Sequence, residues 1–488
     1  MECRDCRQEC MKRRDVLKAL GGGAGLMMGA GLLTGSTSRA AETSERLPEA
    51  QQYGPAGRYS PRIKVAFVRR EEYGMWWPGA VYPGDEARKK YVSRLEKEAG
   101  DMGVDLQLRR EPIHTGDQAN RWMKEVESES PDGHLLVLQD RHGPAWDAAR
   151  SAVKLDVPTV IFCPIGASFT TNTRHFTDQT GAVLYSAPEF DQAIYGMKML
   201  AAAARMKKTR CLVLQGNKTH ERTLADTGIG LRHLPESSYV NAFKDTATSS
   251  SIRSLAKKYR QQARDLTNTD QKDLLEGVRA YAAARSVMEE NEGDAITMDC
   301  LGMGRENSGV PLPCLGWSRL NDTGVPAICE ADEGAIVAHI MTHYLFDRPG
   351  FQQDPVADTD NDSVIGAHCS CATRLKGYDE PPEPFNLSHH HALRDITTQT
   401  MWQKGQPVTS LEVYPGDPTT LEIATGRVIG QLSVPPHGGC VVSVNVKFDG
   451  VDQVRDFPGF HQVWFYGDRG DELQEFAQLC GFNSERIG

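Results

Sequence analysis

The sequence predicts an α/β protein in which two doubly wound parallel-sheet domains precede a β-rich, barrel-like C-terminal domain. The chain has 488 residues, which is too long for one ordinary hydrophobic core and favours two or three domains. From residue 63 to residue 371, short apolar runs typical of strands alternate with segments of helical period. Beyond residue 371 the helical period disappears until Asp471, and alternating polar and apolar segments bounded by Gly, Pro and Asp replace it.

The expected elements follow one another in a simple order. The first α/β domain has predicted strands at 63–68, 104–108, 134–138 and 157–163, with helices at 83–103 and 146–154. The second has helices at 190–206, 251–265 and 274–291 and strands at 209–215 and 295–299, and we expect 216–241 to be irregular. The C-terminal domain has strands at 408–413, 420–430, 440–448 and 462–466 before a helix at 471–480.

These elements predict five segments along the chain. They are a signal peptide at 1–40, a linker at 41–62, an N-terminal α/β domain at 63–180, a second α/β domain at 181–365 that carries the candidate carboxylates, and the β-rich domain at 366–488.

The N-terminal segment has the pattern of an export signal. Arg13 and Arg14 precede a Gly/Ala-rich apolar run of about 15 residues, and the small residues Ser38 and Ala40 allow cleavage before Ala41. Paired arginines before a mildly apolar run are typical of the twin-arginine route, which exports folded proteins. The run is short of the ~20 residues of a membrane span, so we expect a periplasmic protein, with an uncleaved anchor as the alternative.

Composition and charge argue against some classes of binding partner. The formal net charge of -10 argues against nucleic acid or an anionic membrane as the main partner and fits a neutral small molecule. The α/β halves contain no G-x-G-x-x-G or Walker sequence, so nucleotide binding is unsupported. Of 12 cysteines, three lie before residue 11, and the other nine have no spacing typical of a disulfide framework. We therefore expect Cys163, Cys211, Cys329 and the pair around Ser370 to be packed thiols.

The stretch from Ala327 to Cys371 holds the candidate site. An apolar run ends at Cys329 and delivers Glu330 and Asp332, and a helix with the apolar period Ile336, Val337, Ile340, Met341 and Leu345 follows. The chain then presents Asp354 and, after an alternating segment, His368. Carboxylates at a strand end with a later histidine suit a divalent metal that prefers oxygen ligands. The alternative is that the acids only cap the helix, where negative charge is favourable.

Three motifs in this order resemble the superfamily of L-fucose isomerase and L-arabinose isomerase. The first is Pro326-Ala327-Ile328-Cys329-Glu330-Ala331-Asp332, similar to the C-E-x-D that precedes a helix in that family. The second is Asp354-Pro355-Val356, followed by Asn361 and by Gly366-Ala367-His368-Cys369. The third is His461-Gln462-Val463-Trp464-Phe465-Tyr466-Gly467-Asp468, followed by Asp471-Glu472-Leu473. With the predicted architecture, the resemblance covers about residues 63 to 488.

The resemblance implies a metal-dependent aldose–ketose isomerase acting on an open-chain monosaccharide. Glu330, Asp354 and His461 would bind the metal, normally Mn²⁺, with Fe²⁺, Co²⁺ or Zn²⁺ also compatible with these ligands. Glu330 and Asp354 are the two candidates for the base that moves the proton, and His368 would be a metal ligand or a sugar contact. The resemblance also implies a homo-oligomer, a trimer or a hexamer.

Further substrate contacts are less determined by sequence. Trp77, beside Trp76, could stack on a sugar ring or could pack against protein. His390 lies in Ser388-His389-His390-His391, where at most one or two rings can face one site because side chains alternate along a strand. We expect His339 and His343, four residues apart, to form a packed or solvated helix face. Two other functions stay open: another metal-dependent carbohydrate epimerase or lyase, and an exported sugar-binding protein without catalysis.

Overall fold

The computed structural model of the protein describes residues 47–488 apart from 72–73, 78–79, 306–307, 390–394 and 433–439. The predicted signal peptide and the first residues of the linker lie outside the described residues. Among the residues described, no helix combines the length and the apolar character needed to cross a membrane.

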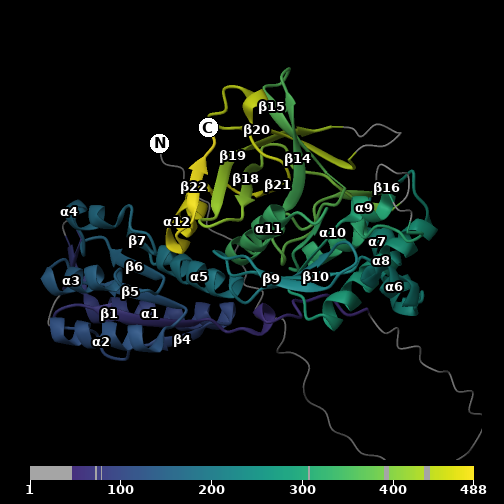
Figure 1. Cartoon of the computed structure of the whole chain (residues 1–488). Helices are drawn as coiled ribbons and strands as arrows, with labels where there is room; N and C mark the ends of the chain where they lie inside the picture. Colours follow the sequence, from purple (N-terminus) through teal and green to yellow (C-terminus); the bar gives the residue numbers. More distant parts are fainter. Residues whose placement is uncertain (1–46, 72–73, 78–79, 306–307, 390–394, 433–439) are drawn as a thin grey trace, which may run out of the picture. The chain divides into compact units, whose positions relative to one another are not determined.

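Five parallel strands form the first sheet, in the order β4-β1-β5-β6-β7 (Figure 1). The four strands predicted for this part of the chain are confirmed within two residues, and a fifth follows the predicted boundary at residue 180. They are β1 (Arg62–Val68), β4 (Asp105–Leu108), β5 (Gly133–Leu138), β6 (Thr159–Pro164) and β7 (Ala182–Ala187).

Both faces of this sheet are covered, which explains the nearly continuous apolar runs of its central strands at 133–138 and 159–164. Ile63 and Val65 of β1 belong to a core cluster with residues of α1 and α5, whereas Ala66 and Val68 belong to another with residues of α2 and α3. The helices of this part are α1 (Gly84–Met102), α2 (Gly116–Glu129), α3 (Gly143–Ala152), α4 (Thr170–Thr173) and α5 (Asp191–Met206).

The second sheet has the order β13-β12-β8-β10-β9, and its first four strands are parallel. Its strands are β8 (Arg210–Leu214), β9 (His220–Thr223), β10 (Gly230–Leu234), β12 (Ala295–Met298) and β13 (Ala327–Cys329). The helices around it are α6 (Ser237–Asp245), α7 (Ser250–Gln262), α8 (Gln271–Glu290), α9 (Cys300–Arg305), α10 (Cys314–Asp322) and α11 (Glu333–Phe346). Parallel pairing brings the carboxyl ends of β12 and β13 to one edge, where Glu330 follows β13.

One expectation for this part is wrong. The stretch 216–241 is not irregular, because it contains β9, β10 and the start of α6. β9 is an antiparallel edge strand whose four residues are all exposed, so it has no apolar alternation that would mark it as a strand.

The C-terminal part contains a closed antiparallel barrel of six strands. The order is β18-β21-β14-β15-β20-β19, and pairing of β18 with β19 closes it. This confirms the predicted β-rich, barrel-like end of the chain, and the barrel begins at Phe351. The strands are β14 (Phe351–Asp358), β15 (Ser363–His368), β18 (Pro407–Tyr414), β19 (Thr420–Gln431), β20 (Val442–Phe448) and β21 (Gln462–Tyr466).

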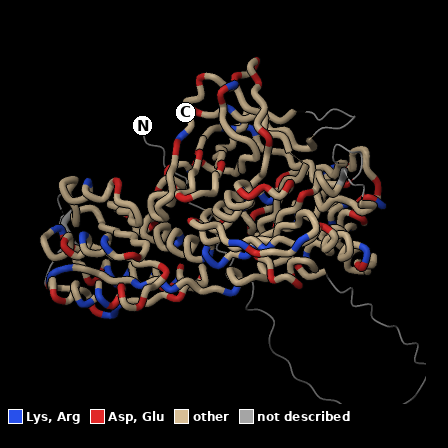
Figure 2. Tube along the Cα trace, in the orientation of Figure 1, with Lys and Arg blue, Asp and Glu red and all other residues tan. Residues whose placement is uncertain are grey.

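Smaller elements complete the described chain. A hairpin of β2 (Gly74–Trp77) and β3 (Ala80–Pro83) precedes α1, and β11 (Leu266–Thr267), β16 (Phe385–His389) and β17 (Ile396–Thr400) form a three-stranded sheet. After the barrel come α12 (Gly470–Cys480) and β22 (Asn483–Arg486), and β22 pairs with β19 in parallel. Figure 2 shows Lys and Arg interspersed with Asp and Glu along the first α/β part.

Helix α11 connects the second sheet to the barrel and is buried on most of its surface. Asp332 caps its N-terminus by accepting a hydrogen bond from the Ala335 N–H at 2.7 Å. His339 is 2 % exposed, so the expected packed face is confirmed at this residue. Its Nε2 accepts a hydrogen bond from the Gly350 N–H at 2.7 Å, which fixes where the chain leaves the helix to enter β14.

Two buried imidazoles predict a pH-dependent stability. Burial lowers the pKa of His134 to about 3 and that of His339 to about 4. Each Nε2 accepts a hydrogen bond, from the Trp122 indole N–H at 3.0 Å and from Gly350, so both rings are neutral when folded. Below the unfolded value of about 6.5 the unfolded chain binds protons that the folded protein does not, so the free energy of unfolding falls as pH falls from about 6.5 towards 4.

Denaturant unfolding at a series of pH values checks this expectation. The His134→Gln variant should reduce the slope against pH by up to about 1.4 kcal/mol per pH unit, and the exposed His175→Gln control should leave it unchanged. A slope that is the same in all three proteins would contradict the assignment of neutral buried rings.

Candidate metal centre

The candidate site begins where β13 ends. Glu330 and Ala331 have φ angles of 70° and 54°, in the left-handed region that costs residues with a side chain of order 1–3 kcal/mol. His461, immediately before β21, has a φ of 59°. Such outliers cluster at functional sites, and here they turn the chain sharply so that a carboxylate and an imidazole face each other.

Strand register explains how distant residues meet. In the antiparallel pair β14–β21, Gln353 opposes Gln462, so the next residues outward, Asp354 and His461, face each other at the end of that pairing. Buried Gln352 of β14 then ties the barrel to β13, because its Oε1 accepts a hydrogen bond from the Cys329 N–H at 2.9 Å. Glu330 is thereby held beside the end of the barrel.

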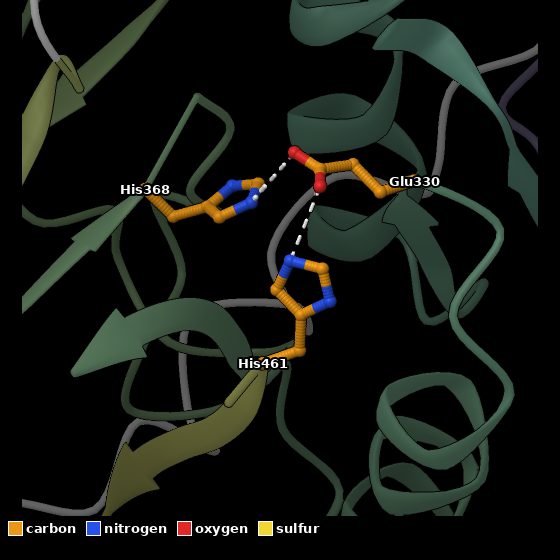
Figure 3. A group of neighbouring side chains, drawn as sticks. All are labelled: Glu330, His368 and His461. Atoms are coloured by element: carbon orange, nitrogen blue, oxygen red, sulfur yellow. Dashed lines mark ion pairs between the residues drawn. The ribbon is translucent and has the colours of Figure 1, made fainter. Parts of the chain in front are cut away.

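Glu330, His368 and His461 form a compact group (Figure 3). The Glu330 carboxylate lies between the two rings, with Oε1 3.5 Å from His368 Nε2 and Oε2 3.2 Å from His461 Nε2. One candidate ligand atom from each residue lies within 4.8 Å of the others, which is close enough for one metal ion. Both rings are buried, and the Glu330 side chain is 19 % exposed.

Asp354 joins this group through His461. Its Oδ1 lies 3.3 Å from His461 Nε2, so the three predicted metal ligands, Glu330, Asp354 and His461, do converge at one imidazole nitrogen. They come from three elements: the turn after β13, strand β14 and the residue before β21.

Asp332 orients the His461 ring. The Nδ1 of His461 lies 3.2 Å from Asp332 Oδ2, so the Nδ1–H donates to this carboxylate and Nε2 is the ring nitrogen that faces Glu330 and Asp354. A carboxylate that holds the far nitrogen of a ligand histidine is the usual second partner in metal sites. The sequence left open whether Asp332 is a carboxylate of the site or a helix cap, and its two carboxylate oxygens make both contacts.

In His368, the ring nitrogen that faces Glu330 carries the hydrogen, and the other ring nitrogen is the acceptor. Its Nδ1 accepts a hydrogen bond from the Cys369 N–H at 2.9 Å, so in the neutral ring the hydrogen is on Nε2, which points at Glu330. Metal binding through Nε2 would need the hydrogen on Nδ1 and the loss of that contact. Of the two roles open from sequence, this geometry favours a hydrogen-bond donor at the pocket over a metal ligand.

Several buried polar atoms at the centre lack hydrogen bonds. Among the described residues, Asp354 Oδ1, His368 Nε2 and His461 Nε2 are buried and make none. Buried polar atoms without a partner are rare in folded proteins, and two of these three, Asp354 Oδ1 and His461 Nε2, lie 3.3 Å apart. A cation held by carboxylate and imidazole would satisfy the atoms of Asp354 and His461.

The electrostatics of the centre also favour a cation. Burial alone would lower the pKa of His461, but its contacts with the Asp332 and Glu330 carboxylates outweigh this effect and raise the pKa to about 10. Burial acts to raise the pKa of Glu330, yet contacts with His368 and His461 hold it well below its ordinary value. Burial raises the pKa of the Asp354 carboxyl. Three carboxylates around one imidazole create a negative potential where a divalent ion would bind.

The two other predicted substrate residues are not brought to this centre by any described contact. Trp77 is the last residue of β2 and pairs with Ala80 of β3, and its side chain lies outside the described part. His390 lies outside the described residues, one position beyond β16. Their predicted roles stay predictions.

No family model matches this chain, and no curated protein matches it. The fold and the site together define a class: a mixed α/β and β-barrel protein with a candidate metal centre.

Proposed function

We propose that this chain is a metal-dependent isomerase that interconverts an open-chain aldose and its ketose. The observation that carries the proposal is the convergence of Glu330 and Asp354 on His461 Nε2 at 3.2 and 3.3 Å, with Asp332 on the opposite nitrogen. The motif similarity to L-fucose and L-arabinose isomerases supports it, since the same three residues occupy the matching motif positions.

Glu330, Asp354 and His461 would hold the ion, for which we propose Mn²⁺, because two carboxylates and one imidazole suit it. A bound divalent ion supplies Lewis acidity to a chelated carbonyl and its neighbouring hydroxyl. His368 would keep the Glu330 carboxylate in place by donating from Nε2 and would contact the sugar. Asp332 would hold the Nδ1–H of His461, which would leave Nε2 to bind the ion once its proton is displaced.

Proton transfer between C1 and C2 requires a carboxylate close to both carbons. Both oxygens of Glu330 face imidazoles, whereas Asp354 contacts His461 through Oδ1. We therefore assign the proton transfer to Asp354, whereas Glu330 would act only as a metal ligand.

Three further properties complete the proposal. The N-terminal pattern supports export by the twin-arginine route to the periplasm, and the motif similarity supports a trimer or hexamer. Each α/β part would be a doubly wound domain, and the coverage of both faces of the first sheet agrees with this. An exported isomerase need not act on L-fucose, so the sugar is proposed only as a neutral monosaccharide.

NMR of the Mn²⁺-loaded protein with a panel of aldoses in D₂O tests the activity. We expect a ketose to form, with solvent deuterium at its C1, because an enediol exchanges the proton taken from C2. The Asp354→Asn variant should form none. An epimer or an elimination product would replace isomerisation by another carbohydrate reaction, and no conversion of any sugar by protein with bound Mn²⁺ would overturn the proposal.

A further inference from the structure

Two cysteines meet at the barrel end that carries His368. Strand β15 ends at His368, which opposes Val442, the first residue of β20. Cys369 is the next residue after this pair on one strand, and Cys440 lies two residues before it on the other. Both positions lie just beyond the last pair of this ladder, where regular pairing has ended, and the two thiols are in contact with each other.

The two thiols differ in access to solvent. Cys369 is 7 % exposed, whereas Cys440 is half-buried and, with Cys480, is one of two cysteines in the described chain that are not fully buried. Thiol–disulfide exchange needs one accessible attacking sulfur and a second sulfur within reach of it. A second neighbouring pair, Cys300 and Cys329, has thiols in contact, but both are buried, so a dissolved oxidant cannot reach them.

We propose that Cys369 and Cys440 form a reversible disulfide by exchange with a low-molecular-weight disulfide, linking β15 to β20 beside the candidate metal centre. The Cys440 sulfur, as thiolate, attacks one sulfur of the small disulfide, whose S–S bond breaks and releases one thiol. The Cys369 sulfur then attacks Cys440 Sγ in the mixed disulfide and expels the second thiol. Both protein thiols are oxidised, the small disulfide is reduced to two thiols, and the two protons go to these.

The bond would act on the site through the backbone. The Cys369 N–H donates to His368 Nδ1 at 2.9 Å, so the residue that sets the His368 ring would itself be tied to β20. His368 Nε2 in turn faces Glu330 at 3.5 Å. The inference does not depend on the proposed isomerase activity, because it concerns the two sulfurs alone.

Peptide mapping of the full chain tests the proposal. The reduced protein is incubated with glutathione disulfide, the remaining thiols are alkylated, and cross-linked peptides are identified by mass spectrometry. Mapping is needed to distinguish this pair from the other ten of the 12 cysteines in the full chain. We expect a peptide that joins Cys369 to Cys440, and dithiothreitol should remove it.

Three variants make the outcome decisive. Cys440→Ser and Cys369→Ser should each abolish the cross-linked peptide, and Cys480→Ser, at the other accessible cysteine, should retain it. Stable glutathione on Cys440 without a bond to Cys369 would overturn the proposal. So would a principal cross-link between Cys300 and Cys329, since that would show that access does not select the pair.

Discussion

Replacing Glu330 by Gln is expected to weaken Mn²⁺ binding by at least about a hundredfold. Loss of a residue that only supports a metal ligand typically weakens metal binding about 10–100-fold, and loss of a ligand itself should cost at least as much. The amide removes the charge that faces His461 and His368 at 3.2 and 3.5 Å, and its N–H₂ group cannot coordinate a cation. The left-handed backbone conformation at residue 330 has the same free-energy cost with Glu or Gln, so the variant should keep the fold. Electron paramagnetic resonance of free Mn²⁺ during a titration measures the affinity.

Glu333→Gln is the matched control. Glu333 is the first residue of α11, only three positions along the chain, but it pairs with Arg222 on β9 rather than with the imidazoles. A partly exposed ion pair contributes about 0–1 kcal/mol to the free energy of unfolding, so its loss should disturb the fold little. Because Glu333 does not face the imidazoles, this variant should change Mn²⁺ affinity by less than about fivefold. If Glu330→Gln binds Mn²⁺ as the unchanged protein does, Glu330 is not a ligand and the centre must be reassigned.

The fold was predictable where burial of an element requires a recognisable pattern of apolar residues. Strands covered on both faces, such as Gly133–Leu138 and Thr159–Pro164, are nearly continuous apolar runs, and α1 has a helical period. The exposed edge strand His220–Thr223 has no such pattern and was missed. Strand β14 contains Pro355, which argues against a central strand, yet β14 pairs with β21 only at residues 351–353, before the proline.

The site was predictable only in its parts. Glu330, Asp354 and His368 lie within one stretch whose order of elements is visible in sequence, but His461 is more than a hundred residues from Asp354. Their proximity depends on the β14–β21 register and on closure of the barrel, which no local pattern encodes. The motif similarity supplied His461, whereas only the three-dimensional arrangement shows that Asp332 holds its ring.

Substitutions at Asp332 separate its two roles and are expected to have the second-largest effect. As a cap, its Oδ1 accepts from the Ala335 N–H, and as a partner of His461, its Oδ2 accepts from Nδ1–H. Serine is also a good N-cap but is too short and uncharged to replace the second contact. Asp332→Ser should therefore lower Mn²⁺ affinity about 10–100-fold while changing the free energy of unfolding by less than about 1 kcal/mol.

Asp332→Asn and Asp332→Ala complete the series. Asparagine keeps both a cap and a neutral acceptor for Nδ1–H, so its Mn²⁺ affinity should lie between those of Asp and Ser. Alanine loses both contacts and should add a destabilisation of about 0.5–2 kcal/mol, measured by denaturant unfolding. Equal Mn²⁺ affinity for Asp, Asn and Ser would mean that residue 332 only caps α11, and the tautomer of His461 would then need another explanation. A loss that follows the charge of residue 332 rather than the stability of the helix would identify Asp332 as part of the metal centre.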